Sequence, residues 1–186
     1  GLIECGYEET AYLYRDDSHK GFISDLGVAL KDNTRIEVKL RPTSNGGGMI
    51  IGEVNPPSDN DDYRFFWYLN RLYYDYGSDR MNPRLAINTD YVLEIGNYYV
   101  KNLTTGNYIL QGDAKSGVAT AHTRTLGLFG ANDYAWIYYI KFYEGDTLVT
   151  DFIPVKLEDG SAVTLYDKVS KTSCSVSNGT FGAPTE

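Results

Sequence analysis

Long hydrophobic runs are missing from this sequence, and none approaches the roughly 20 apolar residues that a membrane-spanning helix needs. Basic residues are also few, since 17 lysines and arginines stand against 25 aspartates and glutamates and leave a net charge of −8. Because affinity for nucleic acid comes largely from basic side chains, this balance argues against a phosphate-backbone partner. Gly1–Glu4 opens on strand-like residues and lacks the pattern of a secretory signal. We therefore expect no membrane and no nucleic-acid partner.

Histidine and cysteine are scarce, with two residues of each. No cluster of them has the spacing of a zinc site, and we expect His19 and His122 to be solvated because their surroundings are polar. No glycine-rich segment stands between a strand and a helix, so Asn45–Gly48 is more simply a turn than a phosphate-binding loop. The sequence thus offers no support for zinc or phosphate-loop chemistry.

The two cysteines, Cys5 and Cys174, stand near opposite ends of the chain. They are either two separate buried thiols or, if the end strands are neighbours, a disulfide that closes nearly the whole chain. In the chain-entropy model such a disulfide stabilises a fold by up to about 5 kcal/mol. It would also indicate an oxidising, extracellular setting. The residues alone leave both alternatives open.

The residues that are present are typical of one globular domain. A chain of 186 residues can bury roughly two-thirds of its unfolded surface, and 42% hydrophobic with 23% charged residues is an ordinary globular composition. We expect a single domain over residues 1–186, and the start on Gly1 without a methionine predicts one module of a larger protein. The 17 tyrosines, against 7 phenylalanines and 2 tryptophans, favour half-exposed strands and wet binding surfaces.

Helix signals are almost absent, whereas short alternating segments recur. In Thr34–Leu40, apolar Ile36 and Val38 alternate with Glu37 and Lys39, which predicts a strand with one buried face. Further strands, separated by glycine, asparagine and aspartate, are expected at Met49–Val54, Arg64–Leu69, Leu72–Tyr76, Tyr91–Ile95, Tyr98–Leu103, Tyr108–Gln111 and Thr125–Phe129. This spacing predicts an all-β fold of two antiparallel sheets, a β-sandwich or jelly roll.

The chain between Tyr134 and Tyr143 has the clearest strand pattern. Its residues alternate with a period of two, so successive side chains point to opposite faces. Trp136 shares its parity with Ile140 and Phe142. We therefore expect Trp136 in the core.

Two more strands complete a predicted antiparallel meander. After the turn at Glu144–Asp146, the second strand is expected over Thr147–Ile153. Pro154 should end it, because proline has no N–H to donate to a ladder. The turn at Asp159–Gly160 then leads into a third strand, Val163–Tyr166.

Five segments of the chain have a pattern that is found together in one family. They are YYDYGSDR at 73–80, IYYIKFY at 137–143, LVTDFIP at 148–154, LYD at 165–167 and NGTF at 178–181. With them the chain resembles the laminin-G-like, concanavalin A-like jelly-roll domains of bacterial surface proteins and phage structural proteins.

The resemblance implies a concanavalin A-like jelly roll whose terminal strands lie close together, which favours the disulfide between Cys5 and Cys174. It also implies an extracellular location, on a bacterial cell surface or in a phage virion, with other modules of the parent protein as neighbours. Members of the fold include lectins, carbohydrate-binding modules and adhesins, but also glycosidases and polysaccharide lyases. The fold alone does not decide among these functions.

The carboxylate pattern of a glycosidase is not evident. A retaining enzyme needs two carboxylates about 5 Å apart, and glucanases of this fold supply them from an E-x-D-x-x-E-like spacing that does not occur here. Glu8 and Glu9 are adjacent and point to opposite faces of a strand. Glu37, Glu94 and Glu144 stand alone, where a solvated strand face or a turn explains them.

A polysaccharide lyase is the other enzymatic alternative. Arg35-Ile36-Glu37 resembles the R-x-E strand motif of alginate lyases, and Tyr139-Ile140-Lys141 is faintly similar to their Y-F-K segment. Those enzymes also need a Gln-x-His strand, and neither histidine of this chain follows a glutamine at that spacing. Charge alternation on an amphipathic strand explains the arginine and glutamate without catalysis. We predict that the protein is not an enzyme.

The acidic loop NPPSDNDD is a candidate calcium site. Asp59, Asp61 and Asp62 would supply the carboxylate oxygens that Ca²⁺ prefers. Structural calcium is frequent in carbohydrate-binding jelly rolls, so the resemblance favours this ligand set. The alternative is a solvated loop whose like charges repel one another.

Two neighbouring strands offer an aromatic surface that could bind a sugar. Flat rings stack on the apolar faces of sugar rings, and flanking polar groups hydrogen-bond the hydroxyls. Alternation predicts the outward positions Arg64, Phe66, Tyr68, Asn70, Tyr73 and Asp75. A loop or a neighbouring module could instead cover these rings, and a β-bulge would reverse the assignment.

The sequence therefore predicts a non-catalytic, lectin-like carbohydrate-binding module that recognises a polysaccharide or surface glycan through exposed aromatic residues. The alternative is a structural or adhesion module of a bacterial surface or phage tail protein, which binds protein or spaces other domains. A glycoside hydrolase or polysaccharide lyase comes third.

Overall fold

The computed structural model describes residues 2–4, 6–44, 50–53, 62–68, 71–77, 79–81, 85–116, 125–129, 134–160, 162–171 and 173–185. For residues 2–4, 53, 62–68, 71–77, 79–81 and 173 the description covers the backbone alone. Within these segments all regular elements are β-strands in antiparallel ladders, which confirms the all-β prediction. In this part of the chain there is no helix long and apolar enough to cross a membrane.

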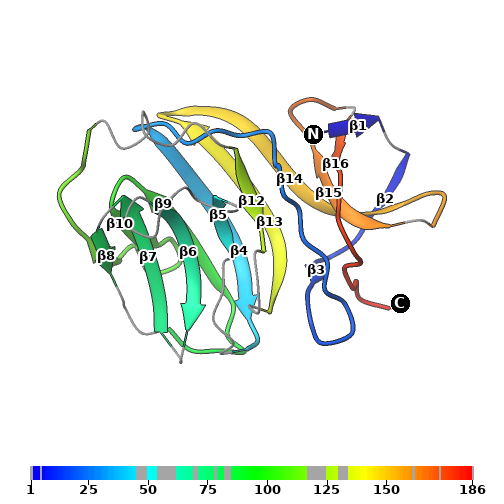
Figure 1. The fold of residues 1–186 in the computed structure, drawn as a ribbon, viewed down its shortest axis with the longest axis horizontal. Coiled ribbons are helices and arrows are strands. Elements are labelled where there is room, and N and C mark those ends of the chain that lie inside the picture. The colour runs from blue at the N-terminus through cyan, green and yellow to red at the C-terminus, as the bar shows by residue number, and fades with distance from the viewer. Residues whose placement is uncertain are drawn as a thin grey trace.

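The larger sheet extends across the whole molecule (Figure 1). Its strand order among the described residues is β1-β16-β15-β14-β13-β4-β9-β10-β11, with β2 paired to β14 and β3 paired to β13. The strands are β1 (Leu2–Glu4), β2 (Tyr7–Glu9), β3 (Leu13–Tyr14), β4 (Thr34–Pro42), β9 (Tyr91–Gly96), β10 (Tyr99–Asn102), β11 (Tyr108–Gln111), β13 (Ala135–Glu144), β14 (Thr147–Leu157), β15 (Val163–Asp167) and β16 (Ser173–Ser175). The predicted strands correspond to these elements with shifts of a few residues at their ends.

The smaller sheet has the order β12-β5-β6-β7-β8. Its strands are β5 (Ile51–Glu53), β6 (Asp62–Tyr68), β7 (Arg71–Gly77), β8 (Asp79–Met81) and β12 (Leu126–Leu128). The turn at Asn45–Gly48 lies outside the described residues.

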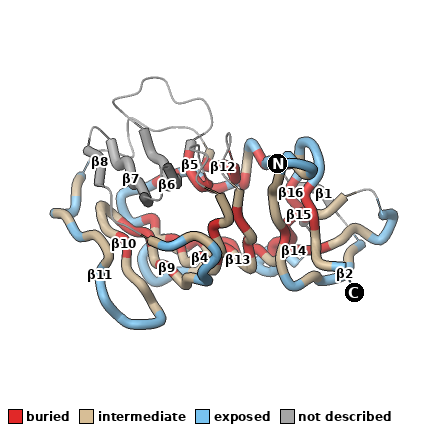
Figure 2. The backbone as a smooth tube through the Cα atoms, turned by 90° about the horizontal axis from the view of Figure 1, so that it is seen from below, coloured by how far each residue is buried: buried red, intermediate tan, exposed pale blue. Residues whose placement is uncertain are grey.

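Both sheets contribute to one hydrophobic core. Ile51 and Leu128 of the smaller sheet belong to the same buried cluster as Val38, Leu93 and Ile140 of the larger one. Figure 2 shows buried residues of β5 and β12 on one side of this core and those of β4 and β13 on the other. The structure thus supports a two-layer, sandwich-like all-β arrangement.

Strand β4 has the alternation that its sequence predicts. Every second residue from Thr34 to Pro42 is buried, whereas Arg35, Glu37, Lys39 and Arg41 between them are half-buried on the opposite face. Because β4 lies between β13 and β9, its charged side chains occupy the middle of the outer face of the larger sheet. We use outer face for the face of β13, β4 and β9 that points away from the core.

A β-bulge in β13 makes the prediction for Trp136 wrong. Ile137 pairs with Leu40 and Tyr139 pairs with Lys39, so Tyr138 is an extra residue between them. An extra residue reverses the alternation. Trp136 is therefore half-buried on the outer face instead of sharing the core side with Ile140.

The prediction that Pro154 ends a strand is also wrong, because β14 continues to Leu157. The pairing of β14 with β13 stops at Phe152, and its pairing with β2 begins at Val155. Pro154 lies at this changeover, where its carbonyl oxygen accepts from the Thr10 N–H at 3.0 Å. Pro154 also pairs with Leu165 of β15, so the ladder between β14 and β15 continues through the proline.

The terminal strands are neighbours, as the resemblance implied. Ile3 in β1 pairs with Cys174 in β16, and both chain ends lie on the same side of the molecule (Figure 1). Cys174 is fully buried beside Val155 and is disulfide-bonded. Cys5 lies outside the described residues, so the pairing of these two cysteines stays a prediction.

Candidate functional site

The predicted aromatic surface falls on the β6–β7 hairpin. Its register is unbroken and pairs Phe66 with Tyr73, Tyr68 with Arg71 and Arg64 with Asp75. These six positions share one face of the hairpin by backbone alternation, opposite to the face of Phe65, which pairs with the buried Ile51. Asn70 lies outside the described residues. That this face binds a sugar stays a prediction.

The predicted calcium ligands fall mostly outside the described residues. Asp59 and Asp61 are not described, and for Asp62, the first residue of β6, only the backbone is. Among the side chains that the structure describes, no group of three or more histidine, cysteine, aspartate or glutamate residues could hold a metal ion. The calcium site stays a prediction.

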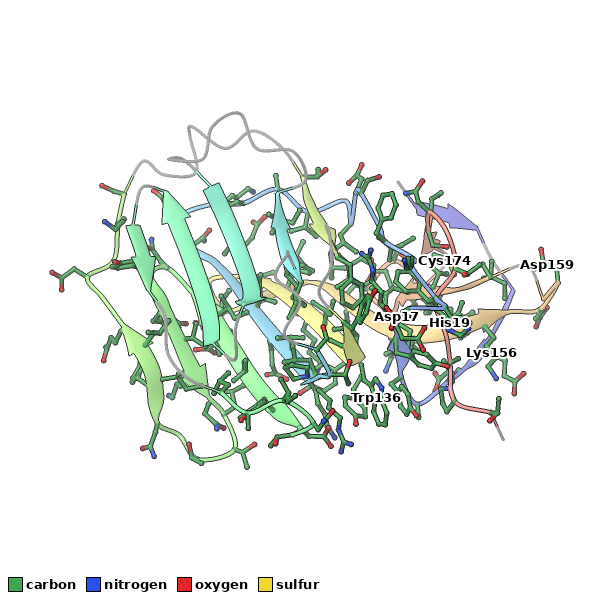
Figure 3. All side chains as sticks on the ribbon, turned by 60° about the horizontal axis from the view of Figure 1, so that its bottom comes forward. Asp17, His19, Trp136, Lys156, Asp159 and Cys174 are labelled. Atoms are coloured by element: carbon green, nitrogen blue, oxygen red, sulfur yellow. The ribbon has the colours of Figure 1, made fainter. Side chains whose placement is uncertain are left out.

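A hollow of about 580 Å³ opens where β3, the start of β13 and the C-terminal segment meet. Four aromatic rings line it, from Tyr12, Tyr14, Tyr134 and Trp136. Arg15, Asp16 and Asp17 supply charged groups, and residues 183–185 form one wall. We call this feature the aromatic hollow. Figure 3 shows Trp136 and Asp17 near each other on this part of the molecule.

Two rings of the aromatic hollow, Tyr12 and Trp136, form a stack with Arg41, which lies outside its lining. The Tyr12 ring lies parallel to the Trp136 ring, with 4.3 Å between ring centroids and 5° between planes. The Arg41 guanidinium lies 4.7 Å from the Trp136 centroid, and Tyr138 meets Tyr12 edge-on at 5.6 Å. Aromatic and cation–π contacts of this kind hold the rings in fixed orientations. The Trp136 ring is therefore held by Tyr12 and Arg41, and Tyr12 is half-buried.

Strand register explains why these residues meet. Trp136 pairs with Tyr14 on one side and with Arg41 on the other, so all three share the outer face. Tyr14 in turn forms an isolated bridge with Gly182 of the C-terminal segment. A Cβ at Gly182 would overlap the Tyr14 ring, so only glycine lets this ring lie across the chain.

Hydrogen bonds fix the acidic loop of the hollow. Asp16 Oδ1 accepts from the Ser18 and His19 backbone N–H groups and lies 2.9 Å from His19 Nδ1. Slight burial acts to raise the pKa of Asp16, but the hydrogen bonds from His19 and Ser18 outweigh it and hold the pKa below its ordinary value. The His19 side chain is 36% exposed and is therefore in contact with solvent, and His122 lies outside the described residues.

Two further tyrosines donate to carboxylates around the hollow. Tyr134 Oη donates to Asp17 at 2.9 Å, which raises the pKa of Tyr134. Tyr138 Oη donates to Asp90 at 2.9 Å, and burial together with this bond raises the pKa of Tyr138 to about 12. Because a raised phenol pKa keeps the proton on the oxygen, these hydroxyls are hydrogen-bond donors at neutral pH.

Glu37 and Glu94, which stand alone in the sequence, lie directly opposite each other in β4 and β9. The prediction that they are isolated is therefore wrong. Glu94 accepts from Arg35 Nη1 at 2.7 Å and from Tyr99 Oη at 2.8 Å, and Glu37 accepts from Tyr139 Oη at 2.8 Å. Both carboxylates act as acceptors.

The lyase-like residues also lie together. Arg35 and Glu37 of β4 pair with Tyr143 and Lys141 of β13, and Tyr139 follows on the same face. Burial and the hydrogen bond to Glu37 raise the pKa of Tyr139, so its hydroxyl keeps its proton at neutral pH.

A second hollow of about 730 Å³ lies beside β2 and the β14–β15 turn. Its lining includes Glu8, Lys156 and Glu158, together with His19 and the C-terminal Phe181. We call it the polar hollow. Figure 3 shows Asp17 and His19 between Trp136 and Lys156.

Sequence reasoning missed both hollows. The available signal was Tyr12-Leu13-Tyr14, in which two tyrosines flank an apolar residue with a period of two. That alternation predicts an outward tyrosine pair around a core leucine, and Leu13 is indeed fully buried. Nothing in the local pattern indicates that Trp136 or residues 183–185 would join this pair.

Comparison with known proteins adds no relative. No family model matches the chain, and no curated protein or solved structure is significantly similar to it. The resemblance to laminin-G-like domains therefore stays a prediction that depends on the five segments quoted above.

Proposed function

We propose that the chain is a non-catalytic, lectin-like carbohydrate-binding module with a concanavalin A-like jelly-roll fold. The aromatic hollow is the proposed site, and the ligand is a polysaccharide or surface glycan. The observation that carries the proposal is the gathering of four aromatic rings and three charged side chains around one hollow of about 580 Å³.

The chemistry of these side chains suits a sugar. The apolar C–H face of a pyranose stacks on an aromatic ring. In this proposal the sugar stacks on the face of Tyr12 opposite to Trp136. Asp16, Asp17 and Arg15 would hydrogen-bond hydroxyl groups at the rim. The stack on Trp136 and Arg41 holds Tyr12 in place before binding, which lowers the entropic cost of association.

Hydrogen bonds within the sheet account for the paired carboxylates Glu37 and Glu94 without a catalytic role. Glu37 and Glu94 are both engaged as hydrogen-bond acceptors by tyrosine and arginine. We infer an extracellular, cell-surface or virion location from the disulfide-bonded Cys174, because disulfides persist in oxidising compartments.

The test is a glycan array and affinity electrophoresis with the wild-type chain and five variants, Tyr12→Ala, Tyr12→Phe, Tyr108→Ala, Phe66→Ala and Tyr73→Ala. Tyr12→Ala should weaken binding about tenfold or more, since it removes a stacking ring, and Tyr12→Phe should retain most of it. Tyr108→Ala is the matched control, because Tyr108 is a 49% exposed tyrosine of β11 outside the hollow. Thermal unfolding of each variant checks that the fold is intact.

One outcome would move the binding site, and another would overturn the proposed function. If Phe66→Ala or Tyr73→Ala abolishes binding and Tyr12→Ala does not, the module binds glycans through the β6–β7 hairpin and the aromatic hollow is the wrong site. If no glycan in a broad plant, microbial and host panel binds, the proposal fails and a structural or adhesion module takes its place.

A further inference from the structure

The polar hollow is chemically suited to the same class of ligand. Glu8, Ser18, Glu158 and Thr180 are exposed at its rim, where carboxylate and hydroxyl groups can hydrogen-bond sugar hydroxyls. The half-buried Leu157, Ala162 and Val163 supply apolar atoms to the lining, and the buried Phe181 lies behind them. This combination of convergent polar groups on an apolar surface is typical of small-ligand sites.

The two hollows share a wall. Asp16 lines the aromatic hollow and is hydrogen-bonded to His19, which lines the polar one. Lys156 of the polar hollow donates to the carbonyl oxygen of Pro184 at 3.4 Å, and Pro184 lines the aromatic hollow. The hollows are therefore neighbours, separated by the loop 16–19 and the C-terminal segment 180–185.

That C-terminal segment is held firmly in place. The Gly21 N–H donates to the Thr180 carbonyl at 2.7 Å, and Tyr14 and Gly182 exchange two backbone hydrogen bonds of 2.9 Å. Phe181 is 4% exposed and belongs to the main core. A wall fixed in this way keeps the two hollows at a constant separation.

We propose that the polar hollow is a second subsite for the same glycan chain, so the ligand is an oligosaccharide or polysaccharide rather than a single sugar. One part of the chain lies on Tyr12 in the aromatic hollow, and a later part hydrogen-bonds Glu8 and Glu158 in the polar hollow. Once one part of a glycan chain is bound, the second subsite meets the next part at a high effective concentration. The affinity for a long chain therefore exceeds the affinity of either subsite alone. The inference rests on the proposed function.

The experiment compares ligand lengths by isothermal titration calorimetry. The probes are glucose, xylose and N-acetylglucosamine series, each from the disaccharide to the octasaccharide. We expect wild-type affinity to rise about tenfold or more with length. Glu8→Ala combined with Glu158→Ala should remove most of this rise and leave disaccharide binding unchanged. Glu9→Ala is the matched control, because Glu9 is the exposed neighbour of Glu8 and does not line the hollow.

Two results overturn the second subsite while the proposed function stands. One is a wild-type affinity that is equal for short and long probes of the series that binds. The other is a length dependence that persists in the double variant. If no probe and no polysaccharide from the array binds, both the subsite and the proposed function fail.

Discussion

At the scale of single residues, Asp90 links the aromatic stack to the outer face of the sheet. One of its oxygens accepts from Arg41 Nε at 2.7 Å and from Tyr138 Oη at 2.9 Å. The hydrogen bond from Arg41 is the main reason that the pKa of Asp90 lies below its ordinary value, and it outweighs slight burial. Arg41 then lies over Trp136, so a charge pair at the surface orients a ring of the proposed site.

This linkage predicts a pH dependence of stability. A carboxylate whose pKa is lower in the folded state stabilises the fold above its unfolded pKa of about 4, and this contribution is lost as the pH falls through the folded pKa. Asp90→Asn should therefore be less stable than the wild type at pH 7, and this difference should be smaller at about pH 3. Urea unfolding at both pH values measures this.

The control for that experiment is Asp146→Asn, at an exposed position in the turn between β13 and β14. It should behave like the wild type at each pH. A constant difference between Asp90→Asn and the wild type across this range would contradict the linkage.

At the scale of elements, the C-terminal segment 180–185 contributes a wall to both hollows. Gly21 is buried against it, and a Cβ at Gly21 would come within 2.7 to 2.9 Å of the backbone of Thr180 and Phe181. Backbone atoms cannot move aside without breaking the hydrogen bond from Gly21 to Thr180. At Gly182 the added Cβ would instead meet the end of the Tyr14 side chain, which can turn away.

These two glycines predict different effects of the same substitution. Gly21→Ala should lower the free energy of unfolding by about 1 to 3 kcal/mol, because it overpacks against backbone. Gly182→Ala should cost less stability but weaken glycan binding, because it displaces the Tyr14 ring from the aromatic hollow. Denaturant titration and calorimetry test both. Equal stability losses in the two variants would contradict the contact argument.

At the scale of the whole molecule, two sheets depend on one core, and the chain ends meet at β1 and β16. Because β1 and β16 lie at opposite ends of the chain, their pairing joins segments that are far apart in sequence. A disulfide at this position restricts the unfolded chain more than one that closes a short loop.

We expect Cys174→Ser, combined with Cys5→Ser, to lower the free energy of unfolding by about 2 to 5 kcal/mol. Denaturant unfolding of the oxidised protein and of the variant measures the difference. Mass spectrometry of the unreduced protein should find one peptide that links the two positions. Two free thiols in the purified protein would contradict the predicted pairing.

The sequence by itself determined the all-β class and the position of most strands. Period-two alternation is a local property, so Thr34–Leu40 could be recognised as a strand and its buried face assigned without any knowledge of its neighbours, and the structure extends this strand to Pro42. The resemblance implied that the two terminal strands are neighbours of each other, and the pairing of β1 with β16 agrees with this expectation.

The tertiary structure alone decided the candidate site. Trp136 reached the outer face because Tyr138 is an extra residue opposite β4, and a bulge depends on the partner strand rather than on local sequence. Pro154 remained inside β14 because two partner strands meet there. Glu37 and Glu94 became neighbours, and Tyr12 met Trp136, through pairings between segments distant in the chain. Alternation tells which side of a strand a residue occupies, but only the register between strands tells which residues it meets.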